Sequence, residues 1–153
     1  MHRYEARIAW KRGGATFTDN RYSRGHQWTF DGGVTVPASS SPLTVPLPYS
    51  VPEAVDPEEA LVAATSSCHM LWFLSIAGQR GFVVDGYSDD AFGVMEKNVD
   101  GKLAFTRITL RPRIEFAGDK SPSADELAAL HHRAHEECFI ANSLKCDVVV
   151  EEG

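Results

Sequence analysis

The stretch of sequence that decides the fold is Asp56-Pro57-Glu58-Glu59-Ala60-Leu61-Val62-Ala63-Ala64-Thr65-Ser66-Ser67-Cys68. It opens with three signals of a helix start. Asp56 can cap the first turn, Pro57 suits the first helical position, and Glu59 stands where a capping box needs a carboxylate. The sequence therefore predicts that a helix begins directly after Val55.

The predicted helix continues well beyond this stretch. Apolar residues recur at the 3.6-residue spacing of a helix from Leu61 to Ile76, and Gly78 or Gly81 offers a stop. Cys68 belongs to this apolar stripe. We therefore expect its thiol in the middle of a long helix, on the side that faces the core.

The chain before this helix reads as a small antiparallel sheet. Residues 3–11 alternate between apolar and charged side chains, which is typical of a half-buried strand. Gly13-Gly14 and residues 31–33 provide turns toward further strands. Residues 37–57 contain six of the eight prolines, so we expect an extended, irregular segment between the sheet and the helix.

The chain after the helix predicts two long antiparallel strands and a second helix. Residues 82–98 and 102–116 flank Asp100-Gly101, a favoured hairpin turn. Ser123 with Glu126 forms another capping box, and the helix that follows carries Cys138 on its apolar stripe and ends near Asn142. Residues 144–151 alternate as a closing strand. The expected fold class is α+β, with antiparallel sheets and two principal helices in a single domain over residues 1–153.

Composition narrows the function classes. The 153 residues carry a formal charge of -6, scattered along the chain without a basic tract, so nucleic acid is not an expected partner. The charged N-terminal stretch lacks the apolar core of a secretory signal, and we find no stretch of membrane-spanning length. We expect a cytoplasmic protein with no membrane partner. In a reducing compartment, three cysteines indicate inert thiols, a metal site or redox chemistry.

Cys68 and Cys138 stand on the apolar faces of two helices, so their thiols can meet where those helices pack. Geometry permits a disulfide between them without requiring one. A free cysteine often behaves as a small hydrophobic residue, and spacing alone favours two inert core thiols. The surrounding motifs reverse that preference.

The stretch from Asp56 to Cys68 resembles the signature of the OsmC/Ohr family of thiol peroxidases. The central helix of that family opens Asn/Asp-Pro-Glu and presents a reactive cysteine ten residues after the glutamate, which is the spacing of Glu58 and Cys68. Cys138 stands four residues before Asn142, in a context similar to that of the family's second cysteine. The strand order and the Pro-rich segment agree as well, so the resemblance covers nearly the whole chain.

The resemblance implies an intertwined homodimer with active sites at the subunit interface. Cys68 would be the peroxidatic thiolate, and Cys138 would convert its sulfenic acid to a disulfide. Glu58 and an arginine of the N-terminal sheet would orient and activate the thiolate. The implied enzyme is an antioxidant oxidoreductase that needs no metal or cofactor. It would reduce organic hydroperoxides and be regenerated by a lipoyl or thioredoxin-like dithiol.

Two of these assignments can be sharpened from the residues. On one straight helix, ten residues separate Glu58 from Cys68 by roughly 15 Å, so Glu58 would have to serve the site of the other subunit. The arginine is Arg24, which precedes Asp31 by seven positions, close to the family spacing; Arg21 is its rival.

Other interpretations remain open at this stage. His131, His135 and Cys138 have a spacing that would suit zinc, although a solvated polar face explains the histidines more simply. Phe139 replaces the proline that commonly follows the second cysteine in the hydroperoxide-resistance branch. His69 is expected to be packed or interfacial, and Cys146 a core or interface residue. The alternative function is a non-catalytic dimer that binds a hydrophobic ligand at the subunit interface.

Overall fold

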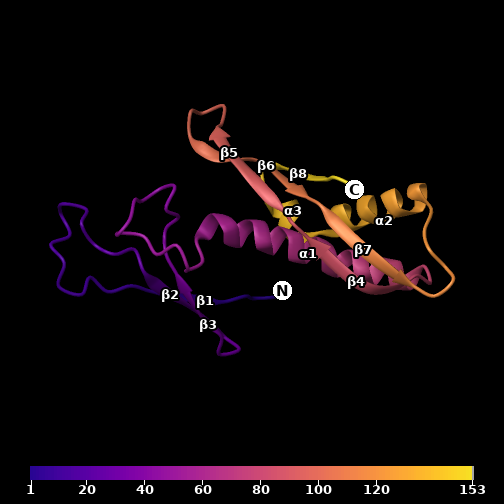
Figure 1. The fold of residues 1–153 in the computed structure, drawn as a ribbon, viewed down its shortest axis with the longest axis horizontal. Helices are drawn as coiled ribbons and strands as arrows, with labels where there is room; N and C mark the ends of the chain where they lie inside the picture. Colours follow the sequence, from indigo (N-terminus) through magenta and orange to yellow (C-terminus); the bar gives the residue numbers. More distant parts are fainter. Residues whose placement is uncertain (153) are drawn as a thin grey trace. The chain divides into compact units, whose positions relative to one another are not determined.

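The computed structural model describes residues 1–152, and the chain divides into two compact units, residues 1–60 and 61–153. The first unit holds one sheet and an extended segment. The second holds two sheets and most of the helical residues (Figure 1). The fold is therefore α+β, as the sequence predicts.

The sheet of the first unit is antiparallel and has the order β1-β2-β3, with bounds Ala6–Ala9, His26–Phe30 and Thr35–Ala38. The turn after β2 closes where Gly33 donates its backbone N–H to the Phe30 carbonyl, and Gly33 adopts a φ of 96°, which favours glycine. The first strand is shorter than predicted. Its four residues are all exposed, so the expectation of a half-buried strand is wrong for the single chain.

Residues 39–56 form the expected irregular segment, outside any helix or strand except for a bridge at its end. Backbone hydrogen bonds tie its two ends together. The N–H of Ser39 donates to the Val55 carbonyl, and the N–H of Val55 donates to the Pro37 carbonyl, each at 3.0 Å. The segment is thus a loop that leads the chain directly into the next helix.

Helix α1 (Pro57–Gln79) begins with the predicted capping box. Asp56 Oδ1 accepts from the backbone N–H of Glu59 at 2.7 Å, and Glu59 Oε1 accepts from the N–H of Asp56 at 2.9 Å. At the other end, Gly81 has a φ of 82° and terminates the helix, so Gly78 remains inside it.

The buried face of α1 differs from the predicted stripe. It consists of Thr65, His69, Phe73, Ile76 and Ala77. Leu71, expected on the stripe, is 60% exposed. Among the described residues, α1 is also the one helix long and apolar enough, by length and composition, to cross a membrane. The expectation that no stretch reaches membrane-spanning length is therefore wrong by this measure, because residues 61–79 carry no charged side chain.

The two long strands predicted for the second unit are each broken in two. One sheet pairs β4 (Val83–Asp89) with β7 (Pro112–Ala117), and the other has the order β5-β6-β8, with bounds Phe92–Lys97, Leu103–Leu110 and Asp147–Val150. Asp89 Oδ1 accepts from the backbone N–H of Arg111 at 2.6 Å and fixes the break. The closing strand β8 runs parallel to β6, and the other pairs are antiparallel.

Helix α2 (Ala124–Glu137) begins at the predicted capping box of Ser123 and Glu126. Its Leu130 and Ala134 join Phe73, Ile76 and Ala77 of α1 in the main core cluster. Side chains of β4 and β7 pack against the same cluster, so both helices lie against this sheet (Figure 1).

Candidate active site

The second unit brings Cys68 and Cys138 together. Both are free thiols, Cys68 half-buried on α1 and Cys138 only 1% exposed. The Cys68 side chain lies close enough to that of Cys138 to help raise the pKa of the Cys138 thiol. The two cysteines therefore meet, as the sequence permits, with Cys68 half-buried and Cys138 buried.

Cys138 does not lie within a continuous helix, which corrects the prediction of a helix that runs to Asn142. Helix α2 ends at Glu137, Cys138 takes φ −63° and ψ 112°, and a short helix α3 (Phe139–Ser143) follows. The Cys138 Sγ accepts from the backbone N–H of Ala141 at 3.4 Å and so caps α3. This break places the sulfur at a helix junction.

The surroundings of Cys138 act on its thiol in opposite directions. Burial is the main cause of its raised pKa, and Cys68 adds to the rise, whereas the N–H of Ala141 opposes it. Cys138 therefore stays a neutral thiol more readily than an exposed cysteine does. Of the two cysteines, Cys68 is the more exposed residue.

Two ring contacts join α1 to the segments around Cys138. His69 Nε2 lies 3.0 Å from His131 Nδ1, with both side chains buried at 1% and 3% exposure. Trp72, one turn after Cys68, packs edge-on against Phe139 with ring centroids 5.4 Å apart. The residues directly after Cys68 and Cys138 thus each take part in one of the two contacts.

A polar group lies beside the histidine pair. Ser66 donates to Asp89 Oδ2, and the same carboxylate opposes the lowering of the His131 pKa. Burial and the neighbouring Asp89 raise the pKa of Tyr87, whose hydroxyl has no hydrogen-bond partner among the described residues. Tyr87, which lies on β4 against the core cluster, therefore remains a neutral phenol.

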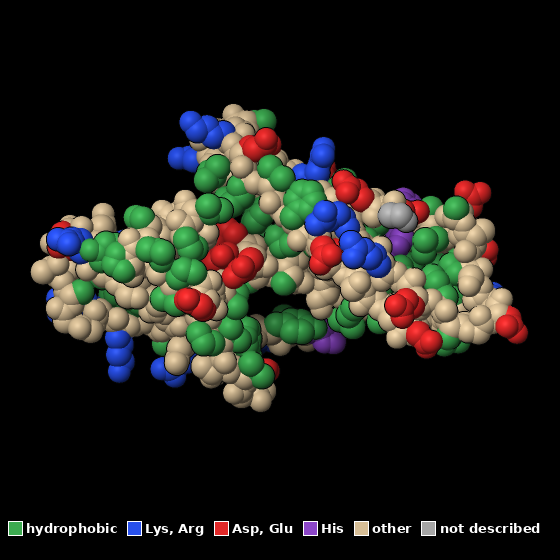
Figure 2. Space-filling model, in the orientation of Figure 1, with side chains coloured by type: hydrophobic (Ala, Val, Ile, Leu, Met, Phe, Trp, Pro, Cys, Tyr) green, Lys and Arg blue, Asp and Glu red, His purple; other side chains and the backbone are tan. Residues whose placement is uncertain are grey.

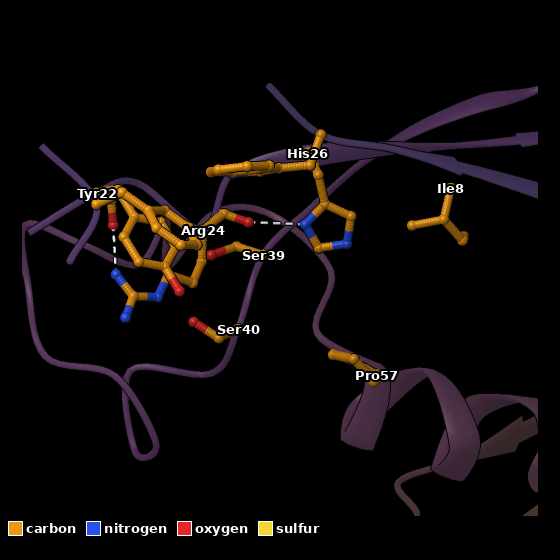
Figure 3. Close-up of a pocket in the computed structure, with 9 residues that line it drawn as sticks. Ile8, Tyr22, Arg24, His26, Ser39, Ser40 and Pro57 are labelled. Carbon is orange, nitrogen blue, oxygen red and sulfur yellow. Dashed lines mark hydrogen bonds between the residues drawn. The ribbon is translucent and has the colours of Figure 1, made fainter. Parts of the chain in front are cut away.

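Arg24 lies in the first unit, in a pocket of about 480 Å³ with mostly apolar and aromatic walls. The pocket is lined by Ile8, Trp10, Phe17, Tyr22, Arg24, His26, Ser39, Ser40 and Pro57 (Figure 3). The guanidinium carbon is 3.6 Å from the centroid of the Tyr22 ring, and Nη1 donates to the Asn20 carbonyl at 2.8 Å. A permanently charged group is thereby fixed in an apolar cavity.

Arg21, the rival of Arg24, is exposed and is not part of the pocket lining. Its Nε donates to the Tyr49 hydroxyl at 2.9 Å, and this bond raises the pKa of the guanidinium. The two arginines thus differ in environment: Arg24 lines a pocket that could hold a ligand, and Arg21 lies at the surface outside it.

Glu58 occupies the first turn of α1. Its Oε2 is buried and has no hydrogen-bond partner within residues 1–152. Buried carboxylate oxygens are normally paired, so this atom is available for a donor. Of the four predicted site residues, Cys68 and Cys138 belong to the second unit, and Arg24 and Glu58 to the first.

The zinc interpretation is not supported. Within the described part of the chain, no three His, Cys, Asp or Glu residues are grouped so that they could hold a metal ion. His131 instead faces His69, whereas His132 is exposed and pairs with Glu136 at 2.8 Å. His69 is packed in the core, as predicted.

Sequence reasoning missed His131 because it was grouped with a polar helix face. A signal was present, since His131 precedes Cys138 by seven residues, two helical turns, and follows the apolar Leu127 by four. That position belongs to the stripe that contacts α1. The pairing with His69 could not be deduced from either helix alone.

The sequence profile of the family described as OsmC-like protein matches residues 50–153. The chain belongs to this family. A comparison with curated protein sequences gives no significant match. Among solved structures, an OsmC-like protein of unknown function from Vibrio cholerae O1 biovar eltor is 51% identical over 100% of both chains, with a TM-score of 0.98.

More distant solved structures share the fold of this OsmC-like protein. An organic hydroperoxide resistance protein from Legionella pneumophila is 16% identical, with coverage of 99% and 96% and a TM-score of 0.69. Another, from Elizabethkingia anophelis, is 14% identical, with coverage of 100% and 98% and a TM-score of 0.72. At these identities the likeness concerns the fold.

The histidine pair predicts an acid-sensitive structure. Burial lowers the pKa of both His69 and His131 from 6.5 to about 4. Above pH 6.5 the folded and unfolded states are both neutral at these rings. As the pH falls from 6.5 toward 4, only the unfolded state takes up protons, so the free energy of unfolding should fall by about 1.4 kcal/mol per pH unit for each histidine.

Chemical denaturation between pH 7.5 and 4 measures this loss. The variant His131→Asn, which keeps one hydrogen-bonding group and cannot be protonated in this range, should show a shallower decline. His132→Asn, at the exposed neighbouring position, should decline as steeply as the wild type. Equal slopes in all three proteins would contradict the assignment.

Proposed function

We propose that this OsmC-like protein is a cysteine-based peroxidase that reduces organic hydroperoxides to alcohols and protects the cytoplasm against oxidative stress. The observation that carries the proposal is the proximity of a half-buried thiol, Cys68, to a buried one, Cys138. A pair of thiols in contact can store two oxidising equivalents as a disulfide. The names of two structural relatives, organic hydroperoxide resistance proteins, support this class of substrate.

The reaction proceeds in two steps. The Cys68 thiolate attacks the peroxide, an S–O bond forms, the O–O bond breaks, and the alkoxide takes a proton and leaves as the alcohol. Cys68 is then a sulfenic acid. The Cys138 sulfur attacks the Cys68 sulfur, the S–O bond breaks, and hydroxide leaves as water with the Cys138 proton. An external dithiol, either a lipoyl protein or a thioredoxin-like protein, reduces the disulfide.

Arg24 and Glu58 complete the proposed site. A guanidinium stabilises a thiolate and can donate to a peroxide oxygen, and a carboxylate holds the guanidinium in place. The apolar, aromatic pocket around Arg24 supports an alkyl or lipid hydroperoxide as substrate. The buried, unpaired Oε2 of Glu58 supports its role as the acceptor. None of these steps calls for a metal or cofactor.

The distribution of apolar surface supports a homodimer. Apolar side chains lie at the surface of both units (Figure 2), among them Ile8 at 59% and Leu71 at 60% exposure. A helix that is apolar on all sides must be covered, by a membrane or by protein. Monomers rarely expose so much apolar surface, and we propose that a second copy covers α1 and β1.

The alternative is a dimer that only binds a hydrophobic ligand, which the pocket of the first unit favours. Binding would not need the pair of thiols in the second unit, so catalysis accounts for more of the molecule. The following experiments separate the two.

Cys68→Ser should abolish consumption of cumene hydroperoxide in the presence of a dithiol, because serine cannot take up the oxidising equivalents. Without added dithiol, Cys138→Ser should still consume one equivalent and accumulate Cys68 sulfenic acid. Mass spectrometry of the oxidised wild type should find a Cys68–Cys138 disulfide. Cys146→Ser serves as control and should behave as the wild type. Dithiol-dependent turnover by Cys68→Ser would refute the peroxidase.

Arg24→Ala should reduce kcat/KM for cumene hydroperoxide by about 100-fold or more, because a positioned cation in an apolar site stabilises charge that develops during attack. Arg21→Ala should change it by less than about threefold, since Arg21 is an exposed residue. Steady-state kinetics measures both. The reverse order would transfer the role to Arg21.

Mixed dimers test whether Glu58 of the partner subunit serves the site of Cys68. Cys68→Ser and Glu58→Gln homodimers should both be nearly inactive. A hybrid of the two chains has one site in which Cys68 and the partner's Glu58 are both intact, so mixing after subunit exchange should restore activity. If Glu58 acts within its own chain, every site of the hybrid carries a substitution and no activity returns.

A further inference from the structure

The contact between His69 and His131 has no part in the chemistry above, yet it joins the two helices that lead to the cysteines. His69 directly follows Cys68 on α1, and His131 precedes Cys138 by two turns of α2. The rings are nearly parallel, at an interplanar angle of 11°. Each helix that delivers a sulfur thus also delivers one partner of this buried hydrogen bond.

The core cluster between α1 and α2 is apolar. Phe73, Ile76 and Ala77 of α1 meet Leu130 and Ala134 of α2. Such contacts are less directional than a hydrogen bond, so a hydrogen bond adds a sharper constraint on how the two helices align. The 3.0 Å hydrogen bond between the His69 and His131 rings depends on distance and angle, so it restricts the relative position of α1 and α2.

The two rings form a matched pair. Each neutral imidazole offers one donor and one acceptor nitrogen, so one ring donates and the other accepts. Burial lowers the pKa of both rings to about 4, which keeps them neutral near pH 7. His135 faces His69, and Asp89 faces His131. Removal of one ring leaves the other buried and unpaired.

His69 is not a general base in this arrangement. Its Nε2 is directed to His131, and its Nδ1 is buried without a hydrogen-bond partner among the described residues. Neither nitrogen contacts a sulfur in the hydrogen bonds of the structure. Any effect of these histidines on the cysteines must act through the positions of the helices.

We propose that the His69–His131 hydrogen bond is a positioning contact that holds the Cys138 sulfur in line with Cys68 and sets the rate of disulfide formation. This inference rests on the proposed function, and it concerns the second step alone. The formation of an S–S bond needs the attacking sulfur opposite the leaving group, and a small misplacement is costly. The attack of Cys68 on peroxide does not involve α2.

The test uses a reaction that needs no peroxide. In a Cys146→Ser background, 5,5′-dithiobis(2-nitrobenzoate) reacts with the accessible Cys68 to give a mixed disulfide. Cys138 then attacks the Cys68 sulfur, the bond to thionitrobenzoate breaks, and release of this thiolate is followed at 412 nm. The rate of the second release reports closure of the Cys68–Cys138 disulfide directly.

His131→Leu should slow the second release by about tenfold or more, whereas the first release should change by less than about twofold. His131→Asn should recover most of the rate, because its side-chain amide reaches the region of Nδ1. His131→Gln should recover less, since its amide lies one methylene further out. His132→Asn is the matched surface control and should behave as the Cys146→Ser parent protein.

With cumene hydroperoxide, the same variants should consume the first equivalent normally and accumulate Cys68 sulfenic acid, detected with dimedone. Closure at the parent rate in His131→Leu would overturn the inference, as would equal rates in His131→Asn and His131→Gln. If His131→Leu does not fold, the Asn and Gln pair decides. A parent protein that closes the disulfide but ignores peroxide would refute the proposed function and leave this inference standing.

Discussion

The structure depends on the burial of α1, whose residues 61–79 include no charged side chain. An apolar helix of this kind is stable only when its side chains are shielded from water. The second unit covers one face with the β4–β7 sheet and α2, through a cluster centred on Phe73 and Leu130. The cover is partial, and Leu71 remains exposed. An apolar helix with one free face requires a further partner, which is why we propose a dimer.

The same helix places two adjacent residues in different environments. Cys68 is half-buried at the edge of the covered face, and His69, about 100° further around the helix, is inside it. Cys68 is therefore partly exposed, while its neighbour His69 is buried in a hydrogen bond to His131. Cys138 is buried at the α2–α3 junction, where the break in the helix brings its sulfur near Cys68 and lets the Ala141 N–H contact it. This N–H opposes the effect of burial on the pKa of the thiol.

The parts of this fold that could be predicted from sequence depend on residues near each other in the chain. The capping boxes at Asp56 and Ser123 are set within three residues and occur as predicted. The break of the long strands involves a hydrogen bond between Asp89 and Arg111, which are 22 positions apart. No local sequence pattern predicts a contact between residues so far apart in the chain. The motif around Cys68 allowed the cysteine pair to be predicted from sequence. The burial of His131 could not be predicted, because only tertiary packing distinguishes it from the neighbouring, exposed His132.

The two ring contacts around the cysteines explain why one is suited to positioning and the other to access. His69 and His131 are buried, neutral and joined by a directional bond, so their geometry resists change. Trp72 and Phe139 meet by an edge-to-face contact, and Phe139 is 65% exposed, so these rings can move at lower cost. A proline in place of Phe139 would lose this contact with α1. The two helices that carry Cys68 and His131 are therefore joined by a buried, directional contact, and Trp72 and Phe139 form a more exposed contact beside it; in the proposed reaction, the exposed contact is the one that can move as a substrate approaches Cys68.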